Sequence, residues 1–62
     1  MASGFYHTYK VVYALKESNG FWSSARKVDY VEAAMQGLAR QQVIESNGGP
    51  LKCQVWSVEQ VD

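Results

Sequence analysis

The sequence predicts a small α+β domain in which one helix covers one face of a three-stranded antiparallel sheet. Residues 5–16 and residues 51–60 alternate apolar and polar side chains with the period of two that is typical of a β-strand. Residues 30–46 instead repeat apolar residues at the spacing of an amphipathic helix. A weaker strand-like run at residues 21–28 completes the order strand, strand, helix, strand, within a single domain spanning residues 1–62.

The strand predicted at residues 5–16 places Tyr9, Val11, Tyr13 and Leu15 on one face. Aromatic and β-branched residues dominate this segment, and both kinds favour strands. The segment Glu17–Gly20 follows, and Asn-Gly between two strand-like runs is a strong hairpin signal.

The length of this hairpin loop decides which way the second strand faces. A loop of Asn19 and Gly20 alone would turn Trp22, Ser24 and Arg26 toward the core. It would bury the charge of Arg26, at a cost of several kcal/mol unless the charge is paired. A three-residue loop with Gly20 in the left-handed conformation turns Phe21, Ser23 and Ala25 inward instead. We favour the three-residue loop, which leaves Trp22 and Arg26 on the other face.

The helix predicted at residues 30–46 has recognisable signals at both ends. Asp29 can serve as its N-cap, with Glu32 three residues later as in a capping box. Gly48 offers a left-handed residue at its C-terminus, and Pro50 prevents further helix. Its expected apolar stripe consists of Val31, Ala34, Met35, Leu38 and Ala39, continued by Gln42 or Val43.

The strand predicted at residues 51–60 places Leu51, Cys53 and Val55 on one face, and Lys52, Gln54, Trp56 and Val58 on the other. A right-handed crossover from the second strand lays this strand beside the first. The predicted sheet order is therefore 2-1-3. A ribbon–helix–helix fold is disfavoured, because the C-terminal segment alternates like a strand and Pro50 opens it.

Composition narrows the classes of function. Six basic and six acidic residues cancel, which disfavours broad electrostatic capture of nucleic acid. One cysteine cannot form an intrachain disulfide, and one histidine leaves a zinc site short of ligands. No stretch approaches the roughly 20 apolar residues of a membrane span. With no signal-peptide pattern at Met1–Gly4, we expect a cytoplasmic protein without cofactor or metal.

Chemistry-bearing residues do not assemble into a catalytic motif. His7 lies in the first predicted strand, and Cys53 has neither a nucleophile elbow nor a redox pair around it. Asp29 and Glu32 are explained by helix capping, and no carboxylate pair indicates acid–base catalysis. We therefore expect a protein that is not an enzyme.

One helix leaves the other face of the sheet uncovered, and that face is the predicted binding surface. An exposed apolar cluster rimmed by polar residues typically marks an interaction site, and Trp, Tyr and Arg often dominate its binding energy. The expected partner-binding residues are Trp22, Trp56, Tyr6, Val12, Lys10, Lys16, Arg26 and Lys52, with Ala14 and Val58 on the same face. If Trp22 and Trp56 were core residues instead, this surface would shrink.

Three functions fit such a face. The first is a small adaptor or inhibitor that binds another protein through the open face or by strand addition at an edge. Its layout is similar to that of some short phage-encoded inhibitors of host enzymes, a likeness of architecture alone. The second is binding of single-stranded nucleic acid, since Lys10, Lys16, Arg26 and Lys52 would lie among aromatic residues. The third is homodimerisation, with the two open faces packed together.

Overall fold

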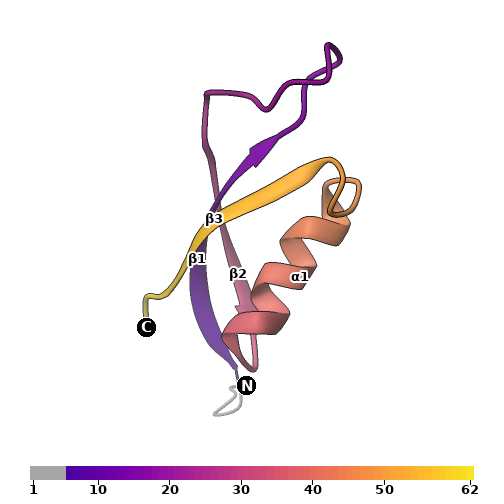
Figure 1. Cartoon of the computed structure of the whole chain (residues 1–62). Helices are drawn as coiled ribbons and strands as arrows, with labels where there is room; N and C mark the ends of the chain where they lie inside the picture. Colours follow the sequence, from indigo (N-terminus) through magenta and orange to yellow (C-terminus); the bar gives the residue numbers. More distant parts are fainter. Residues whose placement is uncertain (1–5) are drawn as a thin grey trace.

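The computed structural model describes residues 6–62 and contains three strands and one helix (Figure 1). The elements are β1 (His7–Leu15), β2 (Lys27–Ala33), α1 (Gln36–Ser46) and β3 (Cys53–Gln60). The sheet order is β2-β1-β3, and β1 pairs antiparallel with both neighbours. The α+β fold, the strand order and the antiparallel pairing predicted from the sequence are confirmed.

The core lies between α1 and the face of the sheet that β1 presents through Tyr9, Val11 and Tyr13. These three side chains are at most 5% exposed, and Val11 is fully buried. From the helix, Ala39, Val43 and Ile44 pack against them, joined by Ala33 and Cys53. The predicted inward face of the first strand is therefore correct. Phe5, where that strand was expected to begin, lies outside the described residues.

The hairpin between β1 and β2 begins with the three-residue loop that the sequence favoured. The backbone N–H of Gly20 donates to the carbonyl of Glu17 at 2.9 Å, and the N–H of Glu17 donates to the carbonyl of Phe21 at 2.8 Å. Gly20 has a φ of 88°, which glycine adopts without steric cost. Lys16 and Trp22 then form a bridge, so Trp22 shares the face of Lys16.

Beyond this bridge the hairpin departs from the prediction. The strand expected at residues 21–28 is replaced by irregular chain, and β2 starts only at Lys27, opposite Tyr13. Phe21 is 71% exposed and Ala25 is also exposed, so their expected burial is wrong. Residues 16–26, which we call the arm, project beyond the end of the helix, and the molecule measures 43 × 17 × 16 Å (Figure 1). The helix ends too early to cover the arm.

The predicted start of the helix is wrong by about two turns. Residues 29–33 continue β2, and α1 begins only after Met35, which has an extended backbone and makes no side-chain cap. Asp29 does not cap a helix: its carboxylate accepts a hydrogen bond from the Tyr13 hydroxyl at 3.0 Å. The five ladder pairs that residues 29–33 make with β1 outweigh the capping-box pattern, because sheet pairing satisfies backbone amides that face β1.

The helix ends as predicted, at the second Glu-Ser-Asn-Gly segment. Gly48 and Gly49 both have positive φ, at 99° and 95°. The N–H of Gly49 donates to the carbonyl of Ile44 at 2.8 Å, which satisfies one of the free carbonyls of the last turn. A short turn then leads into β3 at Cys53, so Leu51 lies in the turn and is 80% exposed, contrary to its expected burial.

β3 contains a bulge that the sequence pattern did not reveal. Val12 pairs with Ser57 and Tyr13 pairs with Val55, which leaves Trp56 without a partner on β1. One extra residue reverses the alternation beyond it. Val58 therefore packs against the core, and its predicted position on the opposite face is wrong. No helix of residues 6–62 is long and apolar enough to cross a membrane.

Candidate binding surface

The open face is the side of the sheet that points away from α1. Even-numbered residues of β1 lie on it, together with the residues paired to them: Lys10 with Tyr30, and Val12 with Val28. Tyr30 is 62% exposed, and Val28 is also exposed, although both are large apolar side chains. The exposed or half-buried apolar residues of this face, which we call the apolar stripe, are Val12, Val28, Tyr30, Trp22 and Trp56.

Trp56 lies on the open face at the bulge of β3, an edge strand of the sheet. The guanidinium carbon of Arg26 lies 4.2 Å from the centroid of its ring, within the range of a cation–π contact. Trp56 remains 51% exposed. Ala14 faces the same side, does not belong to the core cluster, and is nevertheless only 1% exposed, so the larger side chains around it must cover it. The contact between Arg26 and Trp56 lies on the same side of the sheet as Ala14.

Trp22 repeats this arrangement at the base of the arm. The ammonium nitrogen of Lys16 lies 5.6 Å from the centroid of the Trp22 ring. Trp22 is 39% exposed. The open face therefore presents two tryptophans, each with a cation over its ring. The three-residue loop predicted from the sequence gives this placement of Trp22, because it keeps Lys16 and Trp22 on one side of the hairpin.

Charge is distributed unevenly along the open face. Glu59 pairs with Lys10, and Glu32 pairs with Thr8, both near the end where β1 begins. Lys16 and Arg26 lie at the other end, beside the two tryptophans. The face thus has an acidic end, where Lys10 offsets one of two glutamates, an apolar middle, and a basic end.

Val28 and Tyr30 are binding-surface residues that the sequence analysis missed. Tyr30 falls in the helix predicted at residues 30–46, and Val28 falls at the end of the strand predicted at residues 21–28. The signal was present, because Val28, Tyr30 and Glu32 alternate with Lys27, Asp29 and Val31 at the period of a strand. A capping-box pattern and a strand pattern overlapped there, and pairing with β1 decided between them.

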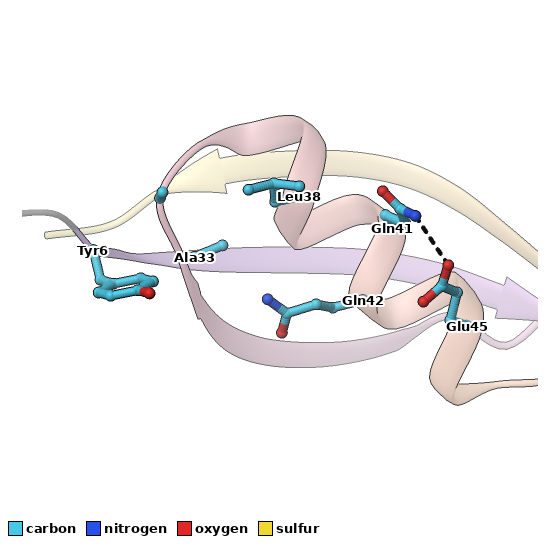
Figure 2. Close-up of a pocket in the computed structure, with 7 residues that line it drawn as sticks. Tyr6, Ala33, Leu38, Gln41, Gln42 and Glu45 are labelled. Carbon is cyan, nitrogen blue, oxygen red and sulfur yellow. Dashed lines mark hydrogen bonds between the residues drawn. The ribbon is translucent and has the colours of Figure 1, made fainter.

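Two predicted surface residues lie elsewhere. Lys52 is in the turn before β3: its carbonyl accepts the N–H of Lys16 at 3.0 Å, while its side chain lies over Gly48 at the end of the helix. Tyr6 precedes β1 and lines a shallow groove of about 360 Å³ at the helix side of the sheet (Figure 2). Ala33, Leu38, Gln42 and the hydrogen-bonded pair Gln41 and Glu45 complete this groove. Neither residue joins the two tryptophans.

The side chains of Cys53 and His7 make contacts within the fold. Burial raises the pKa of the Cys53 thiol, which disfavours the reactive thiolate. The Nδ1 atom of His7 lies 3.5 Å from the carboxylate of Asp62 and 3.3 Å from the side-chain amide of Gln60. The same Asp62 carboxylate accepts a hydrogen bond from the backbone N–H of Thr8. Within residues 6–62 no three His, Cys, Asp or Glu side chains converge as metal ligands would.

No protein-family model, no curated protein and no solved structure matches this chain. The chain's own residues are therefore the basis for assigning it a function.

Proposed function

We propose that this chain is a small, non-enzymatic module that binds another polypeptide through its open sheet face, in the manner of an adaptor or inhibitor. The observation that carries the proposal is the apolar stripe itself. Val28 and Tyr30 on β2 and Trp56 on β3 are each at least 46% exposed, and they lie on the two strands that flank β1 on the open face. A soluble domain gains nothing by exposing such side chains together unless a partner covers them.

The composition of the stripe favours a protein partner. Trp, Tyr and Arg are the residues that most often contribute more than 2 kcal/mol at protein interfaces, and polar residues around them exclude water. Here Lys16 and Arg26 lie beside the two tryptophans, while Lys10, Glu32 and Glu59 stand toward the opposite end of the face. We also propose a reducing, cytoplasmic setting, which the free buried thiol of Cys53 supports.

Immobilised chain should capture a defined set of proteins from a lysate of its native host, identified by mass spectrometry. The double substitution Trp22→Ala and Trp56→Ala should remove that set, while Phe21→Ala should retain it. Phe21 is the matched control, because it is an aromatic residue of the arm that is more exposed than either tryptophan. Far-UV circular dichroism verifies the fold of each variant. Capture of the same proteins by the double variant would refute the proposal.

Binding of single-stranded nucleic acid is the second candidate, because Lys10, Lys16 and Arg26 share the face of both tryptophans. Stacking of a base on Trp56 would require Arg26 to leave the ring that it covers, and Glu32 and Glu59 would repel phosphates. These features place this function behind protein binding. A mobility-shift assay at low salt with single-stranded DNA and RNA tests it, and absence of a shift at micromolar protein excludes it.

A further inference from the structure

We infer that the open face is self-complementary and that a second copy of this chain docks on it, face to face, about a two-fold axis. The inference rests on the proposed function, because it names a polypeptide partner for the same surface. It is carried by the order of side chains along the face: acidic end, apolar middle, basic end. A surface with this order matches a copy of itself when the copy is reversed.

Two symmetric arrangements of facing sheets are possible. With the axis parallel to the strands, like ends meet, so Lys16 and Arg26 of one copy oppose the same cations of the other. With the axis perpendicular to the strands, the ends are exchanged, and the basic end of each copy meets Glu32 and Glu59 of its partner. Like charges placed opposite each other cost free energy, whereas opposite charges at a rim favour association. The reversed arrangement is therefore the one that the charges select.

The reversed arrangement also places apolar groups together. With the two-fold axis near Val12, the Val12 and Val28 side chains of one copy lie opposite the Val12 and Val28 side chains of the other. Arg26 reaches across the sheet to Trp56, so its guanidinium stands over β3, the strand that carries Glu59. Since β3 of one copy faces β3 of the other, Arg26 and Glu59 become partners twice in each dimer, as a two-fold interface requires.

The area that two facing copies would bury indicates how stable the dimer is. A strand of nine residues is about 30 Å long, and three strands span about 14 Å, so the face covers roughly 400 Å² per copy. Two copies bury about 800 Å² in total when each face is treated as flat. This area is below the roughly 1,200–2,000 Å² of stable protein interfaces. We therefore expect a weak, reversible dimer, which another protein can displace from the face.

Sedimentation velocity from about 5 µM to 1 mM tests the inference on the full chain. The wild type should shift from monomer toward dimer over this range. Arg26→Glu and Glu59→Arg, each alone, should be monomeric throughout, because each creates two repulsive pairs in a homodimer. Mixing the two variants should restore a dimer, since both cross-pairs are then attractive. Controls on the helix surface are Arg40→Glu and Glu45→Arg, which should dimerise like the wild type.

The mixing experiment separates this interface from a general effect on folding or net charge. A wild type that stays monomeric at 1 mM overturns the inference, and so does a mixture that stays monomeric while the wild type dimerises. If the monomeric wild type still captures host proteins through Trp22 and Trp56, the proposed function stands and only the self-docking fails. Loss of dimerisation in both helix-surface controls would also overturn the inference, because the interface would then lie elsewhere.

Discussion

The contact between Arg26 and Trp56 provides a quantitative test of the side-chain arrangement on the open face. The guanidinium carbon lies 4.2 Å from the ring centroid, whereas the ammonium of Lys16 lies 5.6 Å from the Trp22 ring, close to the outer limit of about 6 Å. Cation–π contacts at exposed sites stabilise by about 0.5–1 kcal/mol. We expect a coupling energy in this range for Arg26 and Trp56, and less than about half of it for Lys16 and Trp22.

A double-mutant cycle isolates each coupling energy from the other consequences of substitution. For the first pair the variants are Arg26→Ala, Trp56→Leu and the two combined; for the second they are Lys16→Ala, Trp22→Leu and both. Unfolding in urea is followed by far-UV circular dichroism at low micromolar protein, a concentration at which we expect the chain to be monomeric. With a slope of about 1 kcal/mol per molar urea, the expected coupling corresponds to about 0.5–1 M in midpoint.

Arg26→Lys adds a control that keeps the positive charge but removes the flat guanidinium, and it should lose most of the coupling. A coupling energy near zero for Arg26 and Trp56 would refute the view that these two side chains stabilise the open face through a cation–π contact. A larger coupling for Lys16 and Trp22 than for Arg26 and Trp56 would equally contradict it.

Two further predictions concern stability. Gly20→Ala should lower the free energy of unfolding by about 1 kcal/mol, because φ at this position is 88°, whereas Gly37→Ala in the helix should raise it by about 0.5 kcal/mol; urea titration of both variants checks this contrast. Above pH 10 the chain should become less stable, because burial, and then the hydrogen bond to the Asp29 carboxylate, raise the pKa of Tyr13 in the folded state. The unfolded chain therefore ionises first, so the stability is full below pH 10 and is lost as the pH rises; Tyr13→Phe should show a smaller loss between pH 9 and pH 11. An unchanged pH dependence in Tyr13→Phe would contradict the assignment.

The sequence predicted the features that depend on local chemistry. The alternation of Tyr9, Val11 and Tyr13 identified the core face of β1, and two glycines in similar local sequences identified a hairpin turn and a helix end. Each of these signals acts within a few residues, so no knowledge of the rest of the chain is needed. The order of the strands followed from the handedness of the crossover.

The features that failed depend on contacts between distant segments. Asp29 and Glu32 match a capping box, but the same residues lie on β2 because β1 offers a ladder of partners. The arm lacks a regular second strand because no helix lies over it to cover Phe21 and Ala25. The bulge at Trp56 has no local signature, since it reflects how β3 fits β1 on both sides of that residue.

Because of the bulge, Trp56 is the residue of β3 that interrupts the pairing with β1. Removing Trp56 from the chain would bring Val55 and Ser57 next to each other, opposite Tyr13 and Val12, and would leave an uninterrupted ladder. Val55 and Val58 would then alternate with their neighbours without changing sides, so the core would keep its composition. Trp56 is therefore an extra residue in an otherwise regular strand, and its aromatic side chain is added to the open face without a change in the interior of the sheet.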